Sequence, residues 1–344
     1  MADDKYLVNG SERVCVLGAG SWGTTVANLI SRSTKTILWA RSQEIAQEIN
    51  ENHTNNKYLA NNVLSADLGA THQLDQALHR CTLIVVAVPS HGVRAILEAA
   101  CTMIDPRVPT VSLTKGIEAK SNLRMTQVIS EVTGVSRVGF LTGPNLAGEV
   151  IEGQPTASVI ATTDDELGAL IQRLVHSKTM LVYRNRDVVG SEIAGALKNV
   201  MAIAAGMAAG LGFGDNSRAA LITRALAEVG RLGVRLGGRP MTFAGLAGLG
   251  DLVATCSSPR SRNYCVGRML GQGMGIDEIM GKMNMVAEGV KTAPVAVELG
   301  STHQVDMPIS REISRVLASI QTPGECVANL LDRGPGDELE GIEN

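Results

Sequence analysis

The stretch Arg-Val-Cys-Val-Leu-Gly-Ala-Gly-Ser-Trp-Gly, residues 13–23, decides the fold of this chain. Its first five residues predict a short buried strand, and residues 24–32 repeat apolar positions at helical spacing. Gly18, Gly20 and Gly23 form a G-x-G-x-x-G turn between them, the context in which this weak pattern becomes informative. The first glycine permits a tight bend, the second lets a pyrophosphate approach, and the third lets the helix pack on the strand. A glycine turn without a ligand is the alternative, which this context disfavours.

Short aliphatic runs alternate with helical segments through the first half of the chain. This alternation predicts an α/β fold, a Rossmann-like, doubly wound, mostly parallel sheet with helices on both faces. The expected strands cover residues 36–40, 82–88, 110–113, 138–141, 157–161 and 180–183, and the expected helices cover 93–103, 123–132 and a segment that starts near Asp164.

The second half of the chain has a different pattern. After Asp187 the strand-like runs end, and long Ala-, Met- and Leu-rich segments with helical periodicity follow. We expect a nucleotide-binding domain over residues 1–186, an all-helical C-terminal domain over 187–333 for substrate and catalysis, and a disordered acidic tail over 334–344. The clearest helices cover 188–209, 217–236, 288–300 and a region near 310–320.

Composition narrows the possible partners. With 31 basic and 34 acidic side chains, the net charge of −3 gives no general attraction to nucleic acid or to an acidic membrane. An acidic N-terminal stretch without a long apolar run predicts a cytoplasmic protein, and six scattered cysteines predict reduced thiols and no metal site. The small-residue stretch 200–211 is too short to span a bilayer, which takes roughly 20 residues, and predicts a buried helix.

The end of the second expected strand bears on the choice of cofactor. An NAD-specific site often has an acidic residue there, whereas this chain reads Trp39-Ala40-Arg41. A guanidinium can pair with a 2′-phosphate, so Arg41 favours NADP without excluding NAD. A solvated surface arginine is the alternative. We interpret His91, beside a loop after residues 85–88, as structural or as a minor cofactor contact.

Two lysines are candidates for the chemistry. Lys198 lies in an apolar, small-residue helical segment, where burial lowers a lysine pKa as a proton-transferring group requires. An ion-paired or snorkelling Lys198 is the alternative. Lys115 follows the strand 110–113 and emerges at the ligand edge of the sheet, so the two lysines could converge on one site. Asp251 could orient a lysine or accept from a substrate hydroxyl.

A run of hydroxyl, guanidinium and amide side chains is a candidate for binding an anion. Residues 257–263 read Ser-Ser-Pro-Arg-Ser-Arg-Asn near an expected helix start, which suits a phosphate monoester. A solvated basic loop is the usual alternative for such a run.

Together these segments resemble the NAD-dependent glycerol-3-phosphate dehydrogenase family in its bacterial [NAD(P)+] form, from Val14 to about Leu330. The motifs that carry the resemblance are Gly-Ala-Gly-Ser-Trp-Gly at 18–23, Lys-Gly-Ile-Glu at 115–118, Gly143-Pro144, the lysine segment at 192–206, Gly-Asp-Leu at 250–252, Ser-Arg-Asn at 261–263 and Ala-Glu-Gly-Val at 287–290.

The resemblance implies a function and a set of site residues. It implies NAD(P)H-dependent interconversion of dihydroxyacetone phosphate and sn-glycerol 3-phosphate for phospholipid synthesis, by a homodimer that does not insert into membranes. It implies Lys198 as the catalytic proton acceptor. The implied cofactor contacts are Gly18, Gly20, Ser21, Trp22, Gly23, Arg41, Lys115, Ala147, Arg262, Val286 and Glu288, and the implied substrate contacts are Lys115, Gly143, Asn145, Lys198, Asp251, Ser261, Arg262 and Asn263, with Asn199 and Thr255 as further candidates.

One segment departs from the family pattern, and two other functions remain open. The chain reads Thr142-Gly143-Pro144-Asn145-Leu146 where the family has Ser before the glycine and commonly a hydroxyl residue and Phe after the proline, which puts the role of Asn145 in question. A 3-hydroxyacid dehydrogenase of similar plan is one alternative, although residues 261–263 suit phosphate better than carboxylate. A non-catalytic NADP-sensing protein is another, although it would not need Lys115, Lys198 and Asp251 together.

Overall fold

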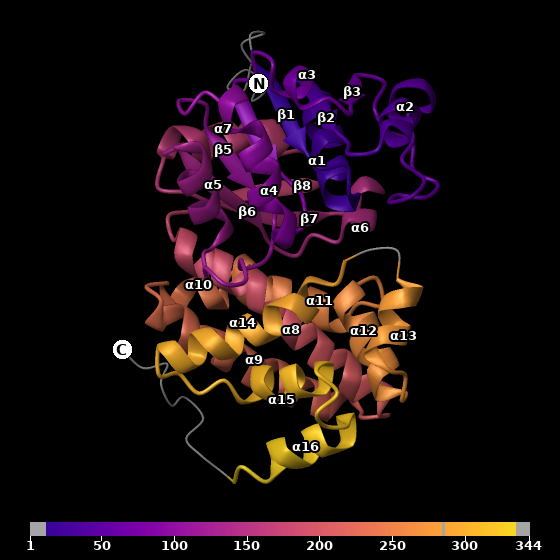
Figure 1. Cartoon of the computed structure of the whole chain (residues 1–344), viewed down its shortest axis with the longest axis vertical. Helices are drawn as coiled ribbons and strands as arrows, with labels where there is room; N and C mark the ends of the chain where they lie inside the picture. Colours follow the sequence, from indigo (N-terminus) through magenta and orange to yellow (C-terminus); the bar gives the residue numbers. More distant parts are fainter. Residues whose placement is uncertain (1–11, 284–285, 335–344) are drawn as a thin grey trace. The chain divides into compact units, whose positions relative to one another are not determined.

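The first half of the chain forms one eight-stranded sheet in a computed structural model that describes residues 12–283 and 286–334 (Figure 1). The strand order is β3-β2-β1-β4-β5-β6-β7-β8, and the pairs β1–β2, β2–β3, β1–β4, β4–β5, β5–β6 and β7–β8 are parallel. The first six strands have the order of a dinucleotide-binding sheet, which confirms the predicted fold class. The strands are β1 (Arg13–Leu17), β2 (Lys35–Trp39), β3 (Leu68–Thr71), β4 (Leu83–Val86), β5 (Thr110–Ser112), β6 (Val138–Thr142), β7 (Thr156–Ala161) and β8 (Met180–Asn185).

The sequence did not predict β3. This strand has four residues, includes Gly69, and buries only Leu68. It lies at an edge of the sheet, where half-exposed residues give neither a continuous apolar run nor a clear alternation.

Helices connect the parallel strands. Their contacts fall into two groups, α1 with α6 and α7, and α4 with α5, as expected for helices on two faces of a sheet. The start predicted near Asp164 is confirmed, because its carboxylate accepts a hydrogen bond from the Leu167 amide at 3.0 Å and caps α7. The helices are α1 (Ser21–Ser31), α2 (Gln43–Asn52), α3 (Leu74–Leu78), α4 (Ser90–Ala100), the 3₁₀ turn η2 (Cys101–Met103), α5 (Met125–Thr133), α6 (Ala147–Ile151) and α7 (Asp165–Val175).

The chain divides into two compact units. The first comprises residues 12–114, Met125–Leu141 and Asn145–Arg186, and the second begins at Asp187. Two short segments from the first half of the sequence, Lys115–Arg124 and Thr142–Pro144, cluster with the second unit. The local sequence pattern does not indicate that these segments belong to the second unit, because their placement depends on contacts with residues far along the chain.

The second unit is helical throughout its described residues, apart from loops and one isolated β-bridge. The Leu246–Gly250 segment is a π-helical turn that leads into α11. The helices are α8 (Val188–Gly210), α9 (Asp215–Arg235), α10 (Pro240–Ala244), η3 (Leu246–Gly250), α11 (Asp251–Ser257), α12 (Arg262–Gly271), α13 (Ile276–Lys282), α14 (Glu288–Thr302), α15 (Pro308–Leu317) and α16 (Pro323–Leu331).

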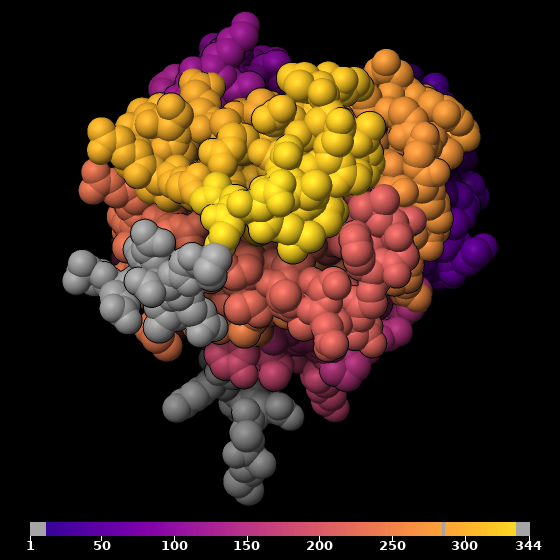
Figure 2. Space-filling model, turned by 90° about the horizontal axis from the view of Figure 1, so that it is seen from below, coloured from indigo at the N-terminus to yellow at the C-terminus, as the bar shows by residue number. Residues whose placement is uncertain are grey.

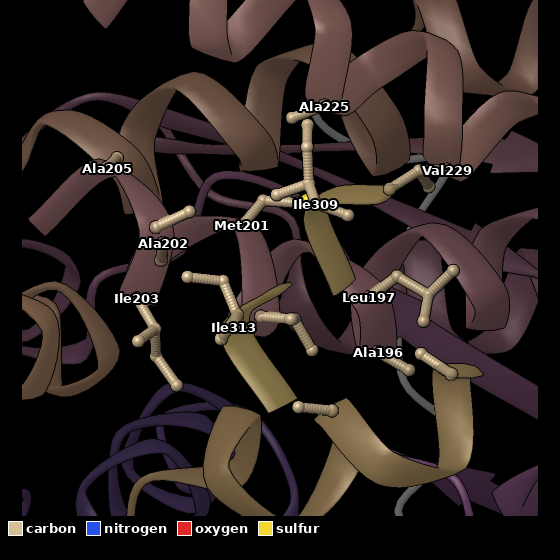
Figure 3. Packing of buried hydrophobic residues seen from close by; sticks show 14 of the residues in the cluster. Ala196, Leu197, Met201, Ala202, Ile203, Ala205, Ala225, Val229, Ile309 and Ile313 are labelled. Atoms are coloured by element: carbon tan, nitrogen blue, oxygen red, sulfur yellow. The ribbon is translucent and has the colours of Figure 1, made fainter. Parts of the chain in front are cut away.

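Helix α8 is the centre of the second unit. Its side chains point toward those of α9 and α15, as the labelled residues of Figure 3 show, and Met201, Val229 and Ile309 all belong to one buried cluster. At 23 residues, α8 is long and apolar enough to cross a membrane, but 83% of its most apolar window is buried inside the protein. It is therefore packed as a core helix, with α9 and α15 against it and α15 and α16 at the surface seen in Figure 2.

Helices α8 and α12 cross with backbone against backbone. A Cβ on Gly206 would lie 2.0 Å from the Tyr264 carbonyl oxygen, and a Cβ on Gly267 would lie 1.9 Å from that of Ile203. One turn further along each helix, a Cβ on Gly210 or Gly271 would lie 2.3 or 2.4 Å from a carbonyl oxygen of the opposite helix. Glycines spaced four residues apart on both helices therefore set how α12 lies on α8.

Replacing Gly267 with Ala is expected to lower the free energy of unfolding by about 2–3 kcal/mol, because its methyl group would force the two backbones apart. Thermal or urea unfolding would measure this loss. Gly281, in α13, is the matched control, since a Cβ there meets nothing within 4 Å. Gly281→Ala should leave stability unchanged or raise it by up to about 1 kcal/mol. An equal effect of both substitutions would contradict the crossing.

Candidate active site

The three glycines of the turn after β1 are required for different reasons. Gly18 has φ +122°, and a Cβ there would lie 2.8 Å from the Ala87 backbone. A Cβ on Gly23 would lie 2.0 Å from the Gly18 carbonyl oxygen, so this glycine lets α1 pack against the turn. A Cβ on Gly20 would meet nothing within 4 Å, although the backbone there suits any residue. The protein itself does not need a glycine at position 20, but a pyrophosphate approaching the backbone would.

A loop after α2 holds the turn in place. The buried Asn55 side-chain amide donates hydrogen bonds of 2.9 Å to the Ala19 carbonyl oxygen and to Thr24 Oγ1. The Ser21 hydroxyl donates to the Tyr58 carbonyl oxygen at 2.9 Å. These contacts fix the start of α1, whose first turn carries no acidic side chain. Trp22 Nε1 is buried there with no partner among the described residues, so it can donate to a ligand.

The neighbouring strand brings Arg41 to the same edge of the sheet. Leu17 of β1 pairs with Trp39 of β2, and the Gly18 amide donates to the Trp39 carbonyl oxygen at 3.0 Å. Arg41 follows two residues later and is exposed. This is the strand end at which dinucleotide-binding sheets hold the adenosine ribose. The glycine turn and Arg41 together fit an NAD(P) molecule.

In the second unit, one carboxylate joins the two candidate lysines. The ammonium of Lys198, on α8, donates to Asp251 Oδ1, and the ammonium of Lys115 donates to Asp251 Oδ2 at 2.7 Å. The Asp251 side chain is 1% exposed, that of Lys198 8%, and that of Lys115 14%. The structure thus brings the lysines together through Asp251, which lies where the π-helical turn η3 passes into α11.

The remaining contacts orient these groups. Lys198 also donates to Thr255 Oγ1 at 2.7 Å, and the Thr255 hydroxyl donates to the Asp251 carbonyl oxygen at 2.6 Å. Lys115 donates to the Gly143 carbonyl oxygen at 3.0 Å, and the Thr142 hydroxyl donates to Asp251 Oδ2 at 3.4 Å. Among the described residues, Asp251 and Thr255 therefore take two of the three hydrogen bonds that the Lys198 ammonium can donate.

Burial gives Lys198 unusual acidity. It lowers the pKa of Lys198 from its ordinary value of 10.5 to about 7, chiefly because the ammonium loses its hydration. The charge of Lys115 lowers this pKa further, whereas Asp251 opposes the shift. Lys198 can therefore exchange a proton near neutral pH.

The start of α12 lies beside this cluster. Ser261 caps α12 by accepting from the Tyr264 amide at 3.3 Å. The Asn263 amide donates to Asn199 Oδ1 at 2.9 Å and its oxygen accepts from the Gly289 amide at 3.0 Å, which ties α12 to α8 and α14. Arg262 is exposed, although surrounding atoms lower its pKa by reducing its hydration and Glu288 opposes that shift. The helix start, with Arg262 next to it, suits an anion.

Some predicted site residues lie neither at the glycine turn nor in the cluster around Asp251. In the first unit, Asn145 binds β7, with its oxygen accepting from Ser158 Oγ at 2.8 Å, and the Ala147 carbonyl oxygen accepts from Thr25 of α1 at 3.4 Å. Val286 and Glu288 lie half-buried at the start of α14. His91 is exposed in the first turn of α4.

The sequence missed several residues that support the site. Thr142 binds Asp251, Asn55 holds the glycine turn, and Arg124 pairs with the buried Glu192 of α8. A signal existed for the last pair, because a glutamate in an apolar helix needs a partner. No signal pointed to Asn55, which looks like any loop asparagine.

A dinucleotide-binding sheet, together with a buried lysine whose pKa is about 7, is typical of the class of nicotinamide-dependent dehydrogenases. Models of the N-terminal and C-terminal parts of NAD-dependent glycerol-3-phosphate dehydrogenase match residues 13–168 and 187–328. The chain therefore belongs to the NAD-dependent glycerol-3-phosphate dehydrogenase family, as its motifs had indicated.

Individual relatives agree with this assignment. The chain is 50% identical over 326 residues to glycerol-3-phosphate dehydrogenase [NAD(P)+] 2 of Sphingopyxis alaskensis, covering 95% of this chain and 98% of that one. It is 48% identical over 330 residues to glycerol-3-phosphate dehydrogenase [NAD(P)+] of Mycobacterium avium, covering 96% and 97%. The crystal structure of glycerol-3-phosphate dehydrogenase from Coxiella burnetii superposes with a TM-score of 0.89 at 35% identity, covering 94% of this chain and 99% of that one.

Gly20→Ala is expected to leave the melting temperature unchanged and to raise the KM for NAD(P)H by about tenfold, because its methyl group enters space that only a ligand would fill. Gly23→Ala is the comparison, since its Cβ meets backbone, and it should lower the melting temperature as well. Unaltered cofactor binding by the Gly20→Ala protein would exclude a pyrophosphate at this turn.

Lys198 should titrate with a midpoint near pH 7, which the 13Cε chemical shift of labelled lysine would measure. Asp251→Asn should move the midpoint down, because the carboxylate stabilises the ammonium, and Lys115→Met should move it up, because a like charge is removed. Shifts of the same sign in both variants would contradict the described cluster, as would a midpoint above pH 9 in the unaltered protein.

Proposed function

We propose that this chain interconverts dihydroxyacetone phosphate and sn-glycerol 3-phosphate by hydride transfer with NAD(P)H, and that Lys198 supplies and removes the proton. The observation that carries this proposal is the Lys198 nitrogen, which is buried, has a pKa of about 7, and is held by Asp251 and Thr255. The family is that of an NAD(P)-dependent oxidoreductase, so the cofactor is NAD or NADP.

The proposed reaction needs one proton for each hydride. When bound, the nicotinamide would supply the hydride that reduces the carbonyl carbon. Lys198, as an ammonium, donates a proton to the resulting alkoxide oxygen, and in the reverse direction the neutral amine accepts the proton from the hydroxyl. Asp251 and Thr255 hold the nitrogen so that its remaining direction faces the substrate oxygen. Lys115, on the same carboxylate, adds positive charge that favours the alkoxide.

The phosphate of the substrate would bind at the start of α12. Arg262 would pair with two phosphate oxygens, and the amide groups near Ser261 and Asn263 would donate to them. Gly143 would contact the substrate through its backbone, and the Asn145 amide would turn from Ser158 and Ala157 to bind it. We assign residues 1–186 to the nucleotide and residues 187–333 to substrate and catalysis.

The proposed cofactor contacts begin at the glycine turn and at the end of β2. Gly18, Gly20, Ser21, Trp22 and Gly23 would surround the pyrophosphate, and Arg41 would pair with a 2′-phosphate, which favours NADPH. Further along the chain, the proposed contacts are Lys115, Ala147, Arg262, Val286 and Glu288.

We further propose a cytoplasmic homodimer that supplies glycerol 3-phosphate for phospholipid synthesis. The names of the relatives concern glycerol 3-phosphate, and the net charge of −3 gives no general attraction to nucleic acid. Sedimentation of the purified protein would measure the oligomeric state.

The purified chain should oxidise NADPH, and more slowly NADH, when dihydroxyacetone phosphate is added. Absorbance at the nicotinamide band would follow the reaction, with glyceraldehyde 3-phosphate and a 3-keto acid as control substrates. Above pH about 7, kcat/KM for reduction should fall roughly tenfold per pH unit, because only the ammonium of Lys198 donates a proton, and the reverse reaction should gain. Lys198→Met should lower kcat by about 10²–10⁴.

Other outcomes would assign a different function. Turnover of the 3-keto acid instead would make the chain a hydroxyacid dehydrogenase. Binding of NADPH without turnover of any ketone would make it a sensor. Equal use of NADH and NADPH would remove the proposed role of Arg41.

A further inference from the structure

The segment Lys115–Arg124 is a short hairpin between β5 and α5. Ile117 and Arg124 form an antiparallel bridge, and the Glu118 amide donates to the Leu123 carbonyl oxygen at 2.9 Å. The tip contains two residues with positive φ, Lys120 and Asn122. Lys115 begins the hairpin and Arg124 ends it, so the two residues are at the open end of its stem.

Both ends of this stem bind helix α8. The Arg124 guanidinium forms an ion pair with Glu192, and the Asn199 amide donates to the Lys115 carbonyl oxygen at 3.4 Å. Glu192 and Asn199 are seven residues apart, so they share one face of α8 and lie two turns, or about 10 Å, apart. One stripe of α8 therefore holds the stem of the hairpin.

Two more contacts attach the rest of the hairpin. The Ile117 side chain is buried in the helical core with Leu197 and Val200. Near the tip, the Asn122 amide donates to Glu298 Oε1 of α14 at 2.9 Å. The hairpin is thus anchored along its whole length within the second unit.

Anchoring the hairpin through Glu192 has a high desolvation cost. Its side chain is 2% exposed and that of Arg124 is 18% exposed. An ion pair so buried loses much of its attraction to desolvation, and an apolar pair of similar size would often stabilise the fold as well or better. In some proteins a buried ion pair instead selects one arrangement of the chain over others.

We propose that Arg124 and Glu192 are positioning residues that hold the Lys115 ammonium against Asp251. This inference rests on the proposed function, in which Lys115 assists the chemistry. Neither residue is among the charged groups that bind Asp251, so each acts through the hairpin. Without their ion pair, the stem should separate from α8 at the Arg124 end, and Lys115 should lose its fixed place on the carboxylate.

A double-mutant cycle between Glu192 and Lys115 tests this. Glu192→Gln alone should lower kcat/KM for dihydroxyacetone phosphate by about tenfold or more, because displacement of a positioned group is costly. In a Lys115→Met background, the same substitution should change kcat/KM by less than about twofold, because the group on which it acts is gone. Glu131→Gln is the matched control, since it breaks the exposed Arg94–Glu131 pair of the first unit, and it should leave kinetics unchanged.

Two results would overturn the inference. One is a Glu192→Gln effect as large with Met at position 115 as with Lys, which would mean that Glu192 does not act through Lys115. The other is a folded Glu192→Gln protein with unaltered kinetics. If Lys115→Met itself has unaltered kinetics, the proposed role of Lys115 fails instead.

A second measurement covers the case in which Glu192→Gln folds poorly. Glu298→Ala removes the acceptor of the exposed tip contact without burying an unpaired charge, and should keep the melting temperature. Competitive acetylation followed by mass spectrometry would measure Lys115 reactivity without any assay of turnover. Reactivity should rise at least severalfold in Glu192→Gln and Glu298→Ala but not in Glu131→Gln. Equal labelling in all three proteins would overturn the anchoring of Lys115 whatever the enzyme's activity.

Discussion

Two ammonium groups share one buried carboxylate, and three separate segments of the second unit bring them together. One carboxylate neutralises one positive charge, so the second charge is the one that burial disfavours. The pKa that falls is that of Lys198, because it is the more deeply buried of the two lysines. The lowered pKa of Lys198 therefore has two causes, which are the excess of one positive charge over the carboxylate and the exclusion of water from the site.

Each partner in this arrangement comes from a different part of the fold. Lys198 is on the central helix α8, Asp251 follows a π-helical turn, and Lys115 comes from a hairpin that leaves the sheet of the first unit. Turns of this π type occur often at functional sites, since they change the direction of a helix within a few residues. The position of Asp251 thus depends on Gly248, whose Cβ would lie 2.0 Å from the Phe243 carbonyl oxygen.

Local pattern predicted most of the strands and the longest helices, but it missed β3 and several short helices and did not indicate which side chains meet. The helix expected at 188–209 spans Val188–Gly210, and the glycine turn has the predicted strand and helix on either side. The contacts of Asp251 join residues 53 and 136 positions apart, and the Arg124–Glu192 pair joins residues 68 apart. A single sequence contains no periodicity over such distances. The one available clue was chemical, because charges in an apolar helix require partners.

The crossing of α8 and α12 has a consequence for how this protein can change over time. Most of its core is aliphatic, and a methyl group lost at one side chain can be replaced by a larger neighbour. Where Gly206 and Gly267 bring backbone onto backbone, there is no side-chain volume to exchange. Substitutions elsewhere in the aliphatic core, whether natural or designed, should therefore be unable to compensate for a larger residue at this crossing. The packing of α12 on α8 should therefore stay the same while the positions of the other helices change.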